Sequence, residues 1–272
     1  MGNIQVMIRG LFFVLFIALP LGLCGQATLF QELLNTSPGV NSKVDSELDN
    51  FIVELKDKRT SSDIEFVNQI FKKSHRKYFR VYKPYVKFSE TLEAGVYDCL
   101  TASSLLAGIL QEFDFDVRII ETNYHIFLMI STEEGEILIE STDRYDGVIT
   151  DASQIEKRIS QYKENLPLQA SADPAKDYFD FTMKLYQTVS PNQLPGLLYF
   201  NQAVVAYNQR NLQECVSLLE ASNHYYESQR TVEFTSILVN TIIESQLDID
   251  LKSQLIRPFI KSLKRSNAMA AR

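Results

Sequence analysis

The segment that decides the fold is residues 125–140, with the sequence HIFLMISTEEGEILIE. Two apolar runs flank the polar residues 132–135, which is typical of a β-hairpin. Side chains alternate between the two faces of a strand. A register that pairs Ser131 with Glu136 therefore gathers five branched apolar side chains on one face. These are Ile126, Leu128, Ile130, Ile137 and Ile139.

The other face of this hairpin carries His125, with Glu140 diagonally across from it on the next strand. A shift of the pairing by one residue would exchange the two faces and bring Asp143 beside His125 instead. That shift would also set Glu140 against Leu128 on the apolar face, where an unpaired carboxylate is costly. The pattern therefore favours Glu140 as the acid beside His125, with Asp143 as the alternative.

A buried helix is predicted to begin at Cys99. Residues 101–110 are apolar or small on most sides, which is typical of a helix buried all round. Asp98 is a residue type that caps helix N-termini, and residues 82–97 before it are expected to form a loop. Backbone N–H groups at a helix N-terminus stabilise a thiolate and can receive the oxyanion of an acyl intermediate. Cys99 is therefore the candidate nucleophile.

Cys99, His125 and Glu140 supply the three groups that a thiol acyl-transfer site needs. These are a thiolate, a base that generates it, and a group that fixes the tautomer of the base. Cys215 is expected to be a small buried residue of a helix core. No His or Cys cluster has the spacing of metal ligands, so neither a metal nor a cofactor is expected.

Three motifs surround these residues: GVYDCLTA at 95–102, YHIFL at 124–128 and ILIESTD at 137–143. Together they resemble the transglutaminase-like superfamily of the papain-like fold, over roughly residues 60–160. That resemblance implies an α+β core with an antiparallel sheet. It also implies that Cys99 attacks a carboxamide or peptide carbonyl, that His125 moves the proton, and that an acid orients His125.

Helices are predicted before this core. Residues 29–60 carry helical periodicity. A second helix is predicted to start at Ser62, whose spacing to Glu65 has the form of a capping box. This helix runs into the basic stretch 72–77, which is expected to be a solvated helix end, with His75 as an ordinary part of it.

The chain after residue 174 is expected to be all helical. Residues 203–222 resemble a single tetratricopeptide unit, a helical hairpin, with Ala203 in its first helix and Cys215 in its second. Apolar positions between 232 and 260 are expected to pack such helices against each other. The predicted organisation is a transglutaminase-like domain over 28–165 and a tetratricopeptide-like region over 174–265.

The N-terminus has the layout of a secretory signal peptide over residues 1–27. Arg9 precedes the apolar run 11–19, and small residues follow. Retention as a membrane anchor is one alternative, although the run is short for a span. Lipid attachment at Cys24 is another alternative. We expect an exported protein, periplasmic or extracellular, without a membrane span once the leader is removed.

Composition excludes some partners. The net charge is −7 and the pI is near 5.1, which argues against nucleic-acid binding. The expected function is an exported peptidase, amidase or acyltransferase that acts on a protein or peptide substrate. The alternative is a non-catalytic cell-envelope module that binds a protein partner through its C-terminal helices.

Overall fold

A computed structural model describes residues 29–37, 42–123, 125–164 and 185–260 of the chain. The predicted signal peptide with Cys24, the motif residue Tyr124 and the C-terminal stretch 261–265 lie outside the described residues.

An antiparallel sheet of five strands forms the centre of the molecule, and the order of its strands is β6-β5-β4-β3-β7. Within the hairpin β4–β5, Ser131 pairs with Glu136 and Leu128 pairs with Ile139. This is the register that the apolar pattern predicts, and the α+β class with an antiparallel sheet is confirmed. The strands are β3 (Asp116–Thr122), β4 (Ile126–Thr132), β5 (Gly135–Ile139), β6 (Val148–Ile149) and β7 (Tyr186–Val189).

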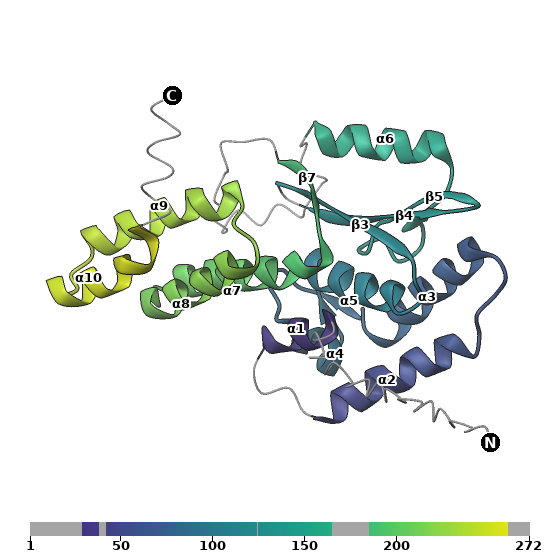
Figure 1. Ribbon diagram of the computed structural model, residues 1–272, viewed down its shortest axis with the longest axis horizontal. Coiled ribbons are helices and arrows are strands. Elements are labelled where there is room, and N and C mark those ends of the chain that lie inside the picture. Colours follow the sequence, from purple (N-terminus) through teal and green to yellow (C-terminus); the bar gives the residue numbers. More distant parts are fainter. Residues whose placement is uncertain (1–28, 38–41, 124, 165–184, 261–272) are drawn as a thin grey trace, which may run out of the picture.

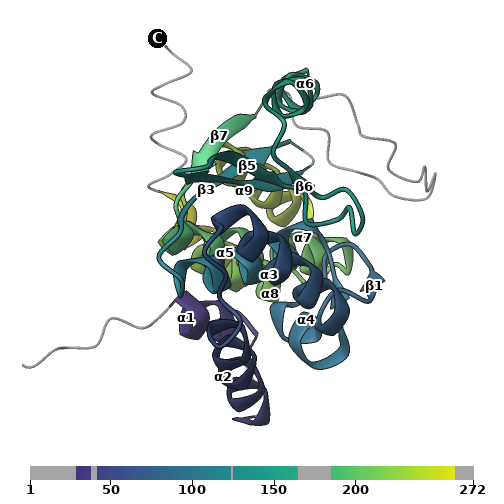
Figure 2. The ribbon, with the colours of Figure 1, turned by 90° about the vertical axis from the view of Figure 1, so that its right-hand side faces the viewer.

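Helices cover both faces of this sheet (Figure 1). The helix that carries Cys99, α5, lies against one face together with α3, and α6 lies on the opposite face (Figure 2). A short parallel pair, β1 (Val81–Tyr82) and β2 (Val96–Tyr97), precedes α5. The helices are α1 (Leu29–Asn35), α2 (Ser42–Lys56), α3 (Asp63–Lys77), α4 (Phe88–Ala94), α5 (Cys99–Gln111) and α6 (Ala152–Lys163).

The two faces of the sheet belong to different apolar cores. All five branched side chains predicted to share one face lie in the main core with α5, and every residue from Leu100 to Leu110 of that helix is buried. On the other face, Phe127 and Met129 pack with Ile155 and Tyr162 of α6. Both faces of β4 are therefore apolar and covered. Its register is specified by Glu140, which a one-residue shift would bring to the apolar face.

Within the described residues 185–260, the helices α7 to α10 follow the sheet and extend away from it (Figure 1). The first two form a helical hairpin around the turn 209–211, at the position where the tetratricopeptide-like pattern predicts one. Cys215 is fully buried in the second core, which these helices share, as predicted. The four helices are α7 (Leu194–Asn208), α8 (Leu212–Tyr225), α9 (Gln229–Glu244) and α10 (Ile249–Ile256), with 3-10 turns at Pro191–Gln193 and Arg257–Phe259.

The prediction of a loop over residues 82–97 is wrong in the middle of that segment, where α4 forms. Glu90 supplies the N-terminal signal, because its side chain accepts the backbone N–H of Lys87 at 2.8 Å. Phe88 and Leu92, one turn apart, are both buried. The helix ends at Gly95, whose φ of 65° is a conformation that glycine adopts without strain.

The all-helical expectation after residue 174 is also wrong, because β7 completes the sheet. Val189 of β7 pairs with Ile119, and Tyr186 pairs with Thr122. Without β7, the outer edge of β3 would present unpaired backbone groups, which native sheets avoid. Tertiary pairing therefore decides the structure of this segment.

His75 is not part of a solvated helix end, since it is 2 % exposed. It lies one helical turn after Phe71, and their ring centroids are 4.4 Å apart. Phe79 and Tyr97 complete the aromatic surroundings of its ring. The basic residues around His75 in the sequence predict an exposed side chain, but His75 lies on the buried face of α3.

Within residues 29–260, none of the helices that the structure describes has both the length and the apolar character needed to cross a bilayer.

Candidate active site

Cys99 is the first residue of α5, and Asp98 caps this helix. Asp98 Oδ1 accepts the backbone N–H of Thr101 at 2.8 Å, and Thr101 Oγ1 accepts the backbone N–H of Asp98 at 3.0 Å. Burial raises the pKa of the Asp98 carboxyl, although hydrogen bonds from Thr101 and from the backbone at Tyr85 and Val86 oppose the shift. The carboxyl group is thus engaged with backbone groups, while Cys99 itself is only half-buried.

His125 ends the turn between β3 and β4. Its backbone N–H donates to Thr122 Oγ1 at 3.1 Å, and its carbonyl accepts the backbone N–H of Thr122 at 2.8 Å. The imidazole ring lies 5.4 Å from the ring of Tyr162 on α6, centroid to centroid. Backbone bonds on one side and an aromatic contact on the other fix the position of the imidazole.

Glu140 follows β5 directly and contacts His125. Its Oε2 lies 2.6 Å from His125 Nε2 and also accepts the hydroxyl hydrogen of Tyr162. Its Oε1 accepts from Thr142, at 2.7 Å from the hydroxyl and 3.2 Å from the backbone nitrogen. The Glu140 side chain is only 4 % exposed, and these donors satisfy a carboxylate that burial would otherwise disfavour.

Asp143, the alternative acid, is engaged elsewhere. Its Oδ1 accepts the backbone N–H groups of Tyr145 at 3.2 Å and Asp146 at 3.0 Å, within its own loop. The structure therefore brings Glu140 to His125 and leaves Asp143 to order the loop that follows.

The Cys99 side chain lies close enough to His125 to raise the pKa of the imidazole. Because Glu140 contacts Nε2, the other ring nitrogen, Nδ1, is the one left for the sulfur. Burial is the largest single effect on the pKa of His125 and lowers it, but the Glu140 carboxylate and the Cys99 side chain together outweigh burial and raise the pKa. At neutral pH His125 is therefore the protonated partner, placed between a carboxylate and a sulfur.

The pKa of Glu140 is shifted in the opposite direction. Burial of this carboxyl raises its pKa, but the charge of His125 and the hydrogen bonds from His125, Tyr162 and Thr142 outweigh burial and lower it. An ionised acid beside a protonated imidazole is the arrangement that holds a catalytic histidine in one orientation.

Two serines connect α5 to the sheet at this site. Ser141 Oγ donates to the backbone carbonyl of Cys99 at 3.3 Å and lies 3.0 Å from Ser103 Oγ. Ser103 Oγ donates to the carbonyl of Ile126 at 3.4 Å. These buried hydroxyls tie the first turns of α5 to β4 and to the end of β5, and so place Cys99 next to His125.

Sequence reasoning missed Tyr162, Ser103 and Ser141. Tyr162 lies 22 residues after Glu140 in the chain, and no local pattern shows that α6 turns back over the sheet. For Ser103 a signal existed, because it is a polar residue inside the run 101–110, which is predicted to be buried. Buried hydroxyls need a hydrogen-bond partner.

A pocket of about 450 Å³ opens beside Glu140. It offers two guanidinium groups, from the loop after β5 and from α6. Its lining residues are Glu140, Thr142, Asp143, Arg144, Tyr145 and Arg158. In the described part of the chain, no three His, Cys, Asp or Glu side chains lie where they could hold a metal ion.

Comparisons with protein-family models, with curated proteins and with solved structures give no match to this chain.

Proposed function

We propose that this protein is a thiol enzyme of the transglutaminase-like kind that acts on a carboxamide or peptide bond through Cys99, His125 and Glu140. One observation carries the proposal. A single imidazole contacts a buried carboxylate at 2.6 Å through Nε2, and its pKa is raised by the neighbouring side chain of a half-buried cysteine at a helix N-terminus. A cysteine that only filled a core would need neither partner.

The reaction follows from these positions. The Cys99 sulfur attacks the carbonyl carbon, and the negative oxygen that forms is stabilised by backbone N–H groups at the start of α5. His125 donates its proton to the leaving nitrogen, so that an amine departs and a thioester to Cys99 remains. His125 then accepts a proton from water or from an amine that attacks the thioester, which releases an acid or a new amide and restores the thiolate.

Glu140 keeps its charge throughout these steps. Because it holds Nε2–H, it fixes the ring so that Nδ1 faces Cys99, and it offsets the positive charge of His125. Tyr162 and Thr142 hold Glu140 in turn. The three groups therefore act as one unit, and removal of any member is expected to cost most of the rate.

The arrangement of the elements supports a papain-like core for this enzyme. A helix that begins at the nucleophile packs on an antiparallel sheet, and adjacent strands of that sheet carry the base and the acid. The proposed location, periplasmic or extracellular, rests on the leader-like residues 1–27. Lipid attachment at Cys24 stays the alternative.

An electrophilic acyl probe tests the proposal. We expect labelling of the chain in a Cys24→Ser background to be lost in Cys99→Ala. We expect it to slow by at least about 100-fold in His125→Ala, because general acid–base catalysis by a positioned side chain contributes about 10²–10⁴-fold. Glu140→Gln should slow labelling more than Asp143→Asn does. Labelling that persists in His125→Ala would overturn the proposed function.

A non-catalytic binding module is the second candidate. Exposed apolar side chains near the end of the helical region favour it, since Ile243 is 55 % and Ile249 is 81 % exposed. Such residues can mark a protein contact. Equal capture of a partner by the wild type and Cys99→Ala, with no probe labelling of Cys99, would support this candidate over the enzyme.

A further inference from the structure

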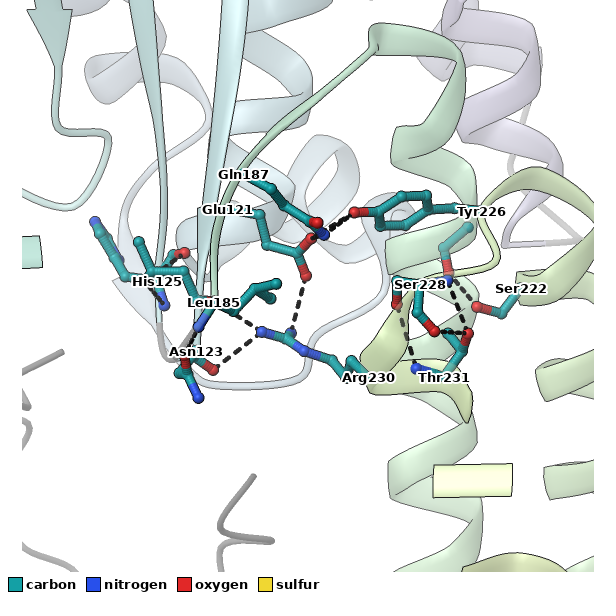
Figure 3. A network of polar contacts seen from close by, with 12 residues as sticks. Glu121, Asn123, His125, Leu185, Gln187, Ser222, Tyr226, Ser228, Arg230 and Thr231 are labelled. Carbon is teal, nitrogen blue, oxygen red and sulfur yellow. Dashed lines mark hydrogen bonds and ion pairs between the residues drawn. The ribbon is translucent and has the colours of Figure 1, made fainter. Parts of the chain in front are cut away.

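The turn that carries His125 is held from the C-terminal helices. Arg230, in the first turn of α9, reaches the end of β3 (Figure 3). Its Nη2 donates to the carbonyl of Thr122 at 2.7 Å and to the carbonyl of Asn123 at 3.1 Å. Thr122 is the last residue of β3, and Asn123 follows it in the turn that leads to His125. One guanidinium therefore holds two consecutive carbonyls of the turn.

A buried acid fixes the other side of this guanidinium. Arg230 Nη1 lies 3.3 Å from Glu121 Oε1, and Glu121 is 2 % exposed. Glu121 Oε2 accepts from Tyr226 Oη at 2.9 Å and from Gln187 Nε2 at 2.9 Å. The acid thus belongs to β3, while its donors come from β7, α9 and the end of α8. A planar guanidinium held this way has little freedom to turn.

The start of α9 is itself fixed. Ser228 Oγ accepts the backbone N–H of Thr231 at 3.2 Å, and Thr231 Oγ1 accepts the backbone N–H of Ser228 at 3.0 Å. This cap sets the helical turn from which Arg230 projects (Figure 3).

Only one residue separates Arg230 from His125 in this network. Thr122 gives its carbonyl to Arg230 and its backbone N–H and hydroxyl oxygen to His125. A movement of Thr122 therefore moves the backbone of His125. The 2.6 Å contact between His125 and Glu140 is sensitive to such a movement, because hydrogen bonds weaken steeply with poor geometry.

We propose that Arg230 is a positioning residue for His125, through which the C-terminal helices set the reactivity of Cys99; this inference rests on the proposed function. Burial of a charged pair is a poor source of stability compared with apolar packing. The two hydrogen bonds from Arg230 to the turn explain better than stability does why an arginine lies at this position. A lysine would keep the charge but not the two directed bonds to the carbonyls.

The test compares three variants in the Cys24→Ser background. The double variant Glu121→Gln/Arg230→Gln removes both charges, so that neither is left buried alone. Arg230→Lys is the conservative change. Leu238→Ala is the matched control, because Leu238 lies on the same helix in the helical core and is 0 % exposed. Each variant is assayed for the rate of Cys99 alkylation against pH, for the unfolding midpoint, and for the titration of His125 by NMR.

We expect the double variant to lower the alkylation rate near pH 6 by about tenfold and to change the rate near pH 9 little, because an ordinary thiol, with a pKa of about 8.5, is mostly ionised at pH 9 without help from a neighbour. Its His125 titration should move toward the ordinary value of about 6.5. Arg230→Lys should lie between it and the wild type. Leu238→Ala should lower the unfolding midpoint and leave both profiles unchanged.

Profiles in the double variant or Arg230→Lys that match the wild type would overturn the inference. Equal shifts in Leu238→Ala would do the same, because they would reduce Arg230 to a structural role. Failure of the proposed function has another signature, which is an alkylation profile that is the same in the wild type and His125→Ala. The NMR titration of His125 would still measure the effect of Arg230 in that case.

Discussion

Tyr162 shares one oxygen of Glu140 with His125. Its ring also stacks on Phe127, with the centroids 4.6 Å apart. The hydroxyl of Tyr162 therefore orients Glu140, while its ring fills the core under α6. A change to phenylalanine separates the two contributions.

We predict that Tyr162→Phe slows probe labelling of Cys99 by about tenfold or more, because one hydrogen bond to an ionised acid is worth about 1.5 kcal/mol or more. Stability should fall by about 1 kcal/mol, measured by urea unfolding. Tyr145→Phe is the matched control, because Tyr145 is 87 % exposed. Unchanged labelling in Tyr162→Phe would show that Glu140 needs no help from this hydroxyl.

His75 gives the molecule a sensitivity to acid that does not involve the site. Burial among aromatic rings, with a smaller contribution from Arg144, lowers the pKa of His75 to about 4. The unfolded chain binds a proton at about pH 6.5, so between these values the unfolded state binds more protons than the folded state. Stability then rises with pH in that window.

We predict that the wild type loses up to about 3 kcal/mol between pH 6.5 and 4 through His75, from about 1.4 kcal/mol per pKa unit. His75→Phe should flatten the dependence of the free energy of unfolding on pH in this window. His224→Gln, at an exposed position, should not. His125 has the opposite effect. Because its pKa is raised in the folded state, its protonation stabilises the fold at low pH, and this stabilisation is lost as the pH rises. Equal slopes in the wild type and His75→Phe would contradict the prediction.

Among the elements, α4 and the turn after it decide how the chain enters the site. Gly95 ends α4 with a φ of 65°, and its carbonyl accepts the backbone N–H groups of Arg80 at 2.9 Å and Val81 at 3.1 Å. β2 and then Cys99 follow directly. A residue that resists this conformation would displace the approach to α5.

We predict that Gly95→Ala costs about 1 kcal/mol or more in the free energy of unfolding, because side chains other than glycine strain a left-handed conformation. A Cβ at this position would also lie 2.3 Å from Nε of Arg80, which must move. Gly95→Asn should cost less, since asparagine tolerates this conformation. Urea unfolding measures both, and an equal cost in the two variants would refute the backbone explanation.

At the scale of the whole molecule, the site and the C-terminal helices share one core. Leu194, Leu197 and Leu198 of α7 and Tyr226 after α8 pack in the cluster that contains α5 and the inner face of the sheet. β7 also reaches this cluster through Val189. The sheet and α5, which carry the candidate site, therefore contact the C-terminal helices through apolar packing as well as through the polar contacts of Arg230.

We predict that a chain ending at residue 164 does not fold cooperatively, because it lacks β7 and these leucines and exposes the edge of β3. Near-ultraviolet circular dichroism and limited proteolysis should show lost tertiary packing. A chain ending at residue 260 is the control and should unfold like the full chain. A cooperative transition in the shorter chain would show that the helical region is dispensable for the fold.

Local periodicity determined the parts of the fold that adjacent residues encode. The alternation over 125–140 fixed the hairpin register, because a one-residue shift would bury Glu140 on the apolar face. The apolar character of residues 101–110 marked α5, and the spacing around 203–222 marked the hairpin α7–α8. Asp98 and Cys99 stand where that buried helix begins.

Tertiary structure alone decided what surrounds those elements. Tyr162 reaches Glu140 and Arg230 reaches Thr122 across gaps of 22 and 108 residues, which no periodicity records. β7 is a strand because the edge of β3 needs a partner, and His75 is buried because Tyr97 and Phe79 close over it. The physical reason is the same in each case: the free energy of these contacts depends on neighbours that are distant in sequence and become adjacent only when the helices pack on the sheet.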